Sequence, residues 1–307
     1  MRLAVDSWAP EYGTAMGGPQ GLQPTDGSVD ISLEMPAEDW SPIRPGPDVT
    51  PATDIRFIDG VRRIDARVWA IDGPSSRPAI AVSYAAGIVH TNGSAAVTEC
   101  EVRRELFGPA GMPALMGSSV TYHPYAVAGE GDEDLIGAVQ RRMGQLEVEV
   151  AARAGGGDLI VVDGPLSGRQ QIDGAVGYVK THRTAYLPPL VEHVVAELPP
   201  GCRTPLFATQ TSWSRFSWYL RLPNGAGHPW AGVVRLEAPA DLPLGAVRAL
   251  ADTTAATLPR FASHPHRDPR APQNLYPIAG LERQLTRRLG DRHHLECVLR
   301  RPAPTAS

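Results

Sequence analysis

The sequence predicts a mixed α/β fold with a mixed central sheet and flanking helices. β-prone runs at 55–59, 65–72 and 79–90 are separated by turn residues, which indicates a meander of three strands. The segment 133–153 has apolar residues at helical spacing. The run Leu-Ile-Val-Val that leads to Asp163 is typical of a buried strand.

The helix expected at 133–153 has the clearest pattern. Its apolar residues recur every three or four positions, and acidic residues at 132–134 favour a helix start because they face the positive end of the helix dipole. Three glycines at 155–157 end it. The apolar stripe consists of Leu135, Val139, Met143, Leu146 and Val150.

The second half of the chain predicts further helices and strands. The alternating segments 215–222 and 230–237 flank a Pro- and Gly-containing connection and are expected to form a hairpin. Helices are expected at 187–198, 243–257 and 278–289, the last ending at Gly290, with a final strand at 293–299.

This element order, a three-strand meander followed by helix, strand and helix, is that of a ribonuclease H-like fold. In that architecture the first and fourth strands are neighbours at the centre of the sheet. Asp59 and Asp163 each stand where one of these strands reaches a glycine, so the fold would bring them together. Taken singly, each Asp-Gly pair is better explained as a turn.

Charged residues are distributed unevenly along the chain. Residues 1–54 contain nine acidic and two basic side chains, whereas the whole chain has a net charge of −4. We expect 1–54 to be an acidic, Pro/Gly-rich N-terminal arm and 55–307 to be a single domain. The arginine-rich stretch 260–301 could follow a nucleic-acid backbone.

The composition also indicates the cellular compartment. Three cysteines lie far apart without a CxxC pair, which favours a reducing compartment and argues against a zinc site. The first residues lack the apolar core of a signal peptide, and the longest charge-free run, 78–98, contains Pro, Asn and Gly. We therefore expect a cytoplasmic protein with no membrane span.

Carboxylates at strand ends are how many nucleases hold divalent metal. Phosphodiester hydrolysis needs an activated water and stabilisation of developing charge, and metal ions supply both. Hard oxygen ligands select Mn²⁺ or Mg²⁺. Asp59 and Asp163 need a third carboxylate, which the helix 133–153 offers as Glu147 or Glu149; the geometry slightly favours Glu147.

Lys180 is the single lysine among 29 basic residues. A compact ammonium at this position could clamp a phosphate or orient the attacking water. Chance survival in an arginine-rich chain explains it equally well.

Other catalytic classes fit less well. The sequence contains no GxxxxGK[ST], GxSxG, HExxH or Rossmann GxGxxG pattern. The histidine pairs at 264/266 and 293/294 lack metal-ligand spacing. The missing P-loop indicates that any motor function would come from a partner.

Five short motifs together resemble the NurA-type nuclease family, the partners of the HerA translocase. They span 55–290 in the family's order: strand-Asp-Gly at 57–60, RRMGQLE at 141–147, VVDGPL at 161–166, GYVK at 177–180 and DPRAPQNLYPI at 268–278. By this resemblance Asp59 matches the first-strand metal ligand, Glu147 the helix ligand and Asp163 the central-strand ligand. Lys180 matches a lysine that often follows that strand.

The resemblance implies a ribonuclease H-like, Mn²⁺-dependent homodimer that degrades DNA ends, cuts single strands and works with a HerA-type hexameric ATPase. The role would be DNA end processing in repair, or antiphage defence. The family's late histidine falls near 281–282, so Asp268 or Glu282 could complete the ligand set. Residues expected to contact nucleic acid are Lys180, Arg183, Arg270, Gln273 and Tyr276.

The sequence thus predicts a metal-dependent deoxyribonuclease. The alternative is a non-catalytic ribonuclease H-like subunit that binds DNA or serves as an adaptor on a translocase. The incomplete C-terminal ligand set favours this alternative, whereas the presence of Asp59, Glu147 and Asp163 opposes it.

Overall fold

The computed structural model describes residues 8–9, 12, 14–16, 22–225 and 227–300. Its architecture is mixed α/β, with a large mixed sheet and flanking helices, as the sequence predicts. The chain forms two compact units that interleave along the sequence. Unit 1 comprises Met1–Phe57, His90–Ala95 and Gly156–Ala279; unit 2 comprises Ile58–Val89, Ala96–Gly155 and Gly280–Ser307.

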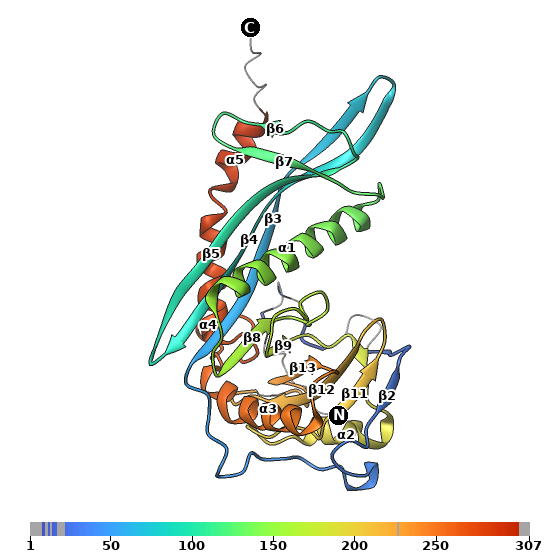
Figure 1. The fold of residues 1–307 in the computed structure, drawn as a ribbon, viewed down its shortest axis with the longest axis vertical. Helices are drawn as coiled ribbons and strands as arrows, with labels where there is room; N and C mark the ends of the chain where they lie inside the picture. Colours follow the sequence, from blue (N-terminus) through green and yellow to red (C-terminus); the bar gives the residue numbers. More distant parts are fainter. Residues whose placement is uncertain (1–7, 10–11, 13, 17–21, 226, 301–307) are drawn as a thin grey trace. The chain divides into compact units, whose positions relative to one another are not determined.

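Unit 1 is built on strands in the order β2-β11-β12-β13-β9-β8-β3-β4 (Figure 1). Its own strands are β2 (Ser28–Asp30), β8 (Leu159–Asp163), β9 (Ala175–Val179), β11 (Phe207–Gln210), β12 (Ser214–Arg221) and β13 (Val233–Pro239). β8 and β9 are parallel, and the pairs from β9 to β2 are antiparallel. The predicted neighbour relation between the first strand and 159–163 is confirmed, because β8 lies beside β3.

Helices complete unit 1. They include α2 (Pro189–Glu197), α3 (Leu244–Thr257) and the short 3₁₀ turns η2 (Ala37–Asp39) and η3 (Leu258–Phe261). A separate parallel pair joins β1 (Gln23–Pro24) to β10 (Thr184–Ala185). The predicted helices at 187–198 and 243–257 and the predicted hairpin at 215–237 are confirmed.

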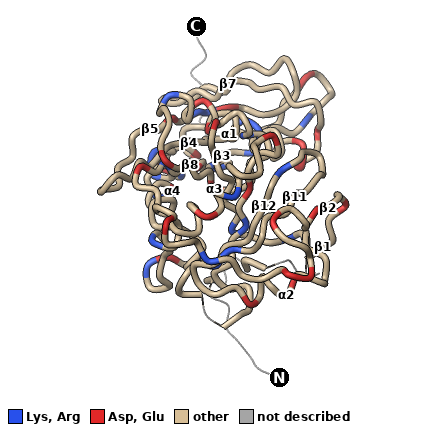
Figure 2. Tube along the Cα trace, turned by 60° about the horizontal axis from the view of Figure 1, so that its bottom comes forward, with Lys and Arg blue, Asp and Glu red and all other residues tan. Residues whose placement is uncertain are grey.

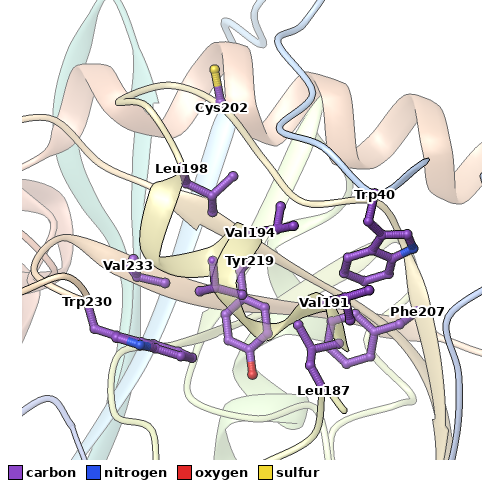
Figure 3. Close-up of a cluster of buried hydrophobic side chains, with 11 residues drawn as sticks. Trp40, Leu187, Val191, Val194, Leu198, Cys202, Phe207, Tyr219, Trp230 and Val233 are labelled. Atoms are coloured by element: carbon purple, nitrogen blue, oxygen red, sulfur yellow. The ribbon is translucent and has the colours of Figure 1, made fainter. Parts of the chain in front are cut away.

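The core of unit 1 forms where α2 packs on the sheet (Figure 3). Val191 and Val194 of α2 meet the rings of Phe207 and Tyr219, whose centroids lie 5.7 Å apart in a stacked arrangement. Burial of each such side chain contributes about 1.5–3 kcal/mol. Apolar burial therefore fixes α2 on this sheet.

The acidic segment predicted to be an arm contributes to unit 1. β2 pairs with β11, and Trp40 lies in the core shown in Figure 3. The Glu34 carboxylate accepts hydrogen bonds from Arg203 at 2.7 and 3.0 Å and from the Leu206 amide at 2.7 Å. Burial opposes ionisation of Glu34, but these bonds outweigh it and lower its pKa. The described residues from 22 to 54 are therefore packed into the unit.

Unit 2 is built on strands in the order β3-β4-β5-β7-β6. Two long strands, β3 (Ile55–Asp72) and β4 (Ser75–Asn92), run through both units, and β5 (Ser94–Gly108) follows. Connections of two residues and one residue join them, and such tight turns require antiparallel pairing. The unit also contains β6 (Leu115–Met116), β7 (Thr121–Ala126), α1 (Asp132–Ala154) and α5 (Arg292–Arg300), and it shares α4 (Tyr276–Arg288) with unit 1.

The helices of unit 2 cover both faces of its sheet. Figure 1 shows α1 lying across β3, β4 and β5. Arg103 of β5 pairs with Glu149 of α1, whereas the next residue, Arg104, donates to the carbonyl of Leu289 just after α4. Successive strand residues point to opposite faces. α1 and the end of α4 therefore lie on opposite faces.

The predicted turn at 60–63 is wrong, because β3 continues through it. Gly60 lies within the strand, where an added Cβ would stand 2.9 Å from Cγ of Met143 in α1. Glycine here permits the close approach of α1 to the strand. Sequence periodicity cannot distinguish a glycine that makes a turn from one that permits such an approach.

The predicted final strand at 293–299 is also wrong, since these residues belong to α5. Leu295 and Val298 are three residues apart and both buried. The Asp291 carboxylate accepts the His294 amide at 2.6 Å and caps the helix start. By contrast, the predicted helix at 133–153 and the strand at 159–163 are confirmed as α1 and β8.

Charged residues of both signs occur throughout the trace (Figure 2). Lys and Arg positions are interspersed with Asp and Glu positions. Among the described residues, no helix combines the length and apolar character needed to cross a bilayer.

We predict that His182 makes the stability of the protein depend on pH. Its buried ring donates Nε2–H to the carbonyl of Val233 at 3.0 Å, and burial lowers its pKa from 6.5 to about 4. Between about pH 4 and pH 6.5 the unfolded chain therefore binds a proton at His182, whereas the folded chain does not. The free energy of unfolding is unaffected by this histidine above about pH 6.5, and it falls by up to about 3 kcal/mol as the pH falls towards 4.

Urea unfolding at pH 7.5 and pH 5 measures this dependence. His182→Gln should flatten the fall in unfolding free energy, whereas His193→Gln, which changes an exposed histidine, should not. An unchanged slope in His182→Gln would contradict the assignment.

Candidate functional site

Asp163 and Lys180 meet at one edge of the unit 1 sheet. Asp163 ends β8, and its partner in the parallel register is Tyr178 of β9, two residues before Lys180. Parallel strands bring their carboxyl ends to the same edge, so the two side chains emerge together. Lys180 Nζ lies 2.6 Å from Oδ2 of Asp163, and their side chains are only 10% and 15% exposed.

A chain of polar side chains fixes Lys180 from the other side. Lys180 Nζ also donates to Oδ1 of Asn274 at 3.1 Å, and Nδ2 of Asn274 donates to Oδ2 of Asp268 at 2.9 Å. Oδ1 of Asp268 accepts the amide of Arg270 at 2.8 Å. Asn274 and Asp268 are buried. The loop 268–274 thereby holds the ammonium against Asp163.

The second oxygen of Asp163 has different surroundings. Oδ1 is buried, and no described residue donates a hydrogen bond to it. A buried carboxylate oxygen normally requires a donor or a cation. Burial, followed by the charge of Asp163, raises the pKa of Tyr178 well above its usual value. The Tyr178 hydroxyl instead donates to the carbonyl of Gln273 at 2.6 Å.

Asp59 and Glu147 both belong to unit 2, and each lies close to Gly60. Oδ1 of Asp59 accepts the Gly60 amide at 2.7 Å, and an added Cβ at Gly60 would lie 2.5 Å from Oε1 of Glu147. Both carboxylates are buried, with Glu147 1% exposed. Asp59 lies within β3, so the prediction that it marks the end of a strand is wrong.

The choice between Glu147 and Glu149 follows from their contacts. Glu149 pairs with Arg103 and its side chain is 46% exposed, so it serves as a surface partner on α1. Glu147 faces β3. Of the two glutamates that the sequence left open, Glu147 is the buried one, and it lies against β3 at Gly60.

The structure thus groups the predicted carboxylates as two sets. Asp163 pairs with Lys180 in unit 1, whereas Asp59 and Glu147 both belong to unit 2. In the described part of the chain, no cluster of three or more His, Cys, Asp or Glu side chains is arranged to hold a metal. Carboxylate oxygens, including the orphaned Oδ1 of Asp163, are nevertheless the donors that Mn²⁺ and Mg²⁺ accept.

The predicted nucleic-acid contacts occupy different environments. Arg183 is exposed, and Arg270 lies over the ring of Tyr12 with 5.3 Å from its guanidinium carbon to the ring centroid. Gln273 is fully buried and its Oε1 accepts the indole N–H of Trp8. The hydroxyl of Tyr276 lies 2.9 Å from Nδ1 of His264.

The two remaining candidate metal ligands, Asp268 and Glu282, also lie in different environments. Both carboxylate oxygens of Asp268 are engaged, by Asn274 and by the Arg270 amide. Glu282 is a half-buried residue of α4 in unit 2. Sequence reasoning missed Glu237, a buried carboxylate that bonds the loop after Asp163. Its signal was a pair of opposite charges, Arg235 and Glu237, inside a strand whose other residues are apolar.

We predict that Gly60→Ala destabilises the protein. The added methyl group would collide with Glu147 and Met143, and overpacking of this kind costs about 1–3 kcal/mol. Gly280→Ala is the matched control, because its Cβ meets nothing within 4 Å and alanine favours a helix. Thermal unfolding should show a lower Tm for the first variant only.

We also predict that Asp163 and Lys180 are energetically coupled. Lys180→Met should cost about 2–4 kcal/mol because it leaves a largely buried carboxylate without its cation. Adding Asp163→Asn should recover part of the loss. A double-mutant cycle from urea unfolding should give a coupling above about 1 kcal/mol; additive effects would show that the pair contributes nothing to stability.

Comparisons with known proteins assign no family to the chain. No family model matches it, and no curated protein matches it. What the site can do therefore follows from its own residues, their burial and their charges.

Proposed function

We propose that the protein is a metal-dependent DNA nuclease with a ribonuclease H-like core. The observation that carries the proposal is the asymmetric environment of Asp163. Lys180 holds Oδ2, whereas Oδ1 is buried without a donor among the described residues. A carboxylate fixed in this way is prepared to bind a cation through its second oxygen.

The proposed metal ligands are Asp59, Glu147 and Asp163. When bound, Mn²⁺ or Mg²⁺ would supply an activated water and stabilise charge on the phosphate. Lys180 fixes the orientation of Asp163 and places a positive charge beside it, where a phosphate would be attracted. Asn274 and Asp268 restrict the movement of Lys180.

The sequence supports a partner for this nuclease. The 307 residues contain no P-loop motif, so translocation along DNA would require a separate motor. The resemblance to NurA-type nucleases makes a HerA-type hexameric ATPase the proposed motor and a homodimer the proposed assembly. DNA end processing or antiphage defence is the proposed role, in the cytoplasm.

One observation favours the alternative of a non-catalytic DNA-binding or adaptor subunit. Lys180 neutralises Asp163 at 2.6 Å, as a purely structural ion pair would. In that case Asp163 would contribute to stability and not to cleavage. The two functions therefore differ in what the carboxylates do for activity.

We predict that cleavage of linear and single-stranded DNA requires metal and these carboxylates. Metal ions contribute several kcal/mol to catalysis, so Asp163→Asn, Asp59→Asn and Glu147→Gln should each lower the rate by roughly 100-fold or more. EDTA should abolish cleavage. The measurement is release of labelled fragments with Mn²⁺ and with Mg²⁺, in the presence and absence of a motor partner.

Matched controls separate catalysis from folding. Glu149→Gln changes the exposed glutamate on the same helix as Glu147, and Asp158→Asn changes an exposed aspartate just before β8. Both should retain activity. Cleavage that persists in both Asp163→Asn and Asp59→Asn, or that is absent under every condition, would contradict the nuclease proposal.

A further inference from the structure

The turn that follows Asp163 is tightly fixed. Gly164 has φ +95°, a conformation that favours glycine, and its amide donates to the carbonyl of Tyr178 at 2.8 Å. Two residues later, the Leu166 amide donates to Oε2 of Glu237 at 3.1 Å. This buried bond joins the turn to β13, 71 residues further along the chain.

Glu237 reaches the turn across a glycine. In the sheet register, Glu237 of β13 pairs with Gly177 of β9, which pairs with Val162 of β8. An added Cβ at Gly177 would lie 3.0 Å from the Leu166 amide nitrogen and 3.1 Å from the Gly164 carbonyl oxygen. Because Gly177 has no side chain, the turn can pack directly against the sheet at this position.

Two arginines fix the Glu237 carboxylate. Oε1 accepts Nη2 of Arg235 at 2.7 Å and forms an ion pair with Nε of Arg215 at 3.1 Å. The three side chains are 1–8% exposed. Both guanidinium groups also lie over the ring of Tyr186, at 4.4 and 5.2 Å from its centroid. A carboxylate held on one oxygen by two cations has its other oxygen directed at the turn.

We infer that Glu237 is a positioning residue for Asp163, an inference that rests on the proposed nuclease function. Glu237 acts through the Leu166 amide, which lies three residues after Asp163. Holding the turn at this point sets the direction in which β8 presents the Asp163 carboxylate. Glu237 itself would contact neither metal nor DNA.

Hydrogen–deuterium exchange of the peptide 164–169 tests whether Glu237 holds the turn. Glu237→Ala should increase exchange at the Leu166 amide, whereas Glu237→Gln retains an oxygen acceptor and should preserve slow exchange. Gly177→Ala approaches the turn from another strand and should reproduce the effect of Glu237→Ala while leaving the arginine contacts in place.

Specific activity tests whether holding the turn matters for Asp163. Loss of a residue that orients a metal ligand commonly costs roughly 10- to 100-fold. We expect a fall in kcat of that size for Glu237→Ala with little change in KM for DNA, partial rescue by Glu237→Gln, and a weaker affinity for Mn²⁺ in the absence of DNA.

Glu34→Ala is the matched control. Glu34 is also a buried glutamate of unit 1 that accepts a backbone amide, that of Leu206, and pairs with two arginines. Its removal should lower Tm without changing exchange at 164–169 or activity per folded molecule. Equal loss of activity in both alanine variants would show that Glu237 has only a structural role.

Two results would overturn the inference directly. One is wild-type exchange at 164–169 in folded Glu237→Ala protein, and the other is faster exchange with unchanged activity and Mn²⁺ affinity. If wild-type protein shows no metal-dependent cleavage, the nuclease proposal fails; the exchange and Mn²⁺-binding results then still decide whether Glu237 positions Asp163.

Discussion

Arginine pairing of buried carboxylates is the interaction on which both units depend. An ionised carboxylate taken out of water costs several kcal/mol unless a cation and hydrogen bonds compensate it. Glu34, Asp65 and Glu237 each receive an arginine at 2.7 Å. The Asp65 and Glu237 pairs are made within a strand, whereas the Glu34–Arg203 pair spans 169 positions. The Glu34 pair explains how an acidic N-terminal segment can be packed into the fold.

Asp163 departs from this rule because its cation is a lysine. A planar guanidinium can occupy both oxygens of a carboxylate, as Arg203 does with Glu34. An ammonium is a point charge, and at Asp163 it engages only Oδ2. The lysine leaves the carboxylate compensated in charge but incomplete in hydrogen bonding. That difference is the physical basis for considering Asp163 a ligand and the arginine-paired carboxylates structural.

Local patterns predicted local structure well. Apolar spacing identified α1, and the parallel strand ends of β8 and β9 account for the meeting of Asp163 with Lys180. Prediction failed where a residue type has two uses. Gly60 was interpreted as a turn because its contact with α1 is made across 80 or more positions of sequence. Glu237 was missed for the same reason, since its significance lies in a bond to Leu166, 71 positions earlier in the turn after β8.

The single lysine gives the protein an unusual chemical property. Lys180 provides the only ε-amine in the chain, so an amine-directed reagent has one side-chain target. That amine is held by Asp163 and Asn274 and is 10% exposed. Its nucleophilicity is therefore set by the state of its carboxylate partner. Covalent labelling at one known atom would report directly, by a change in mass, when a ligand alters the ion pair.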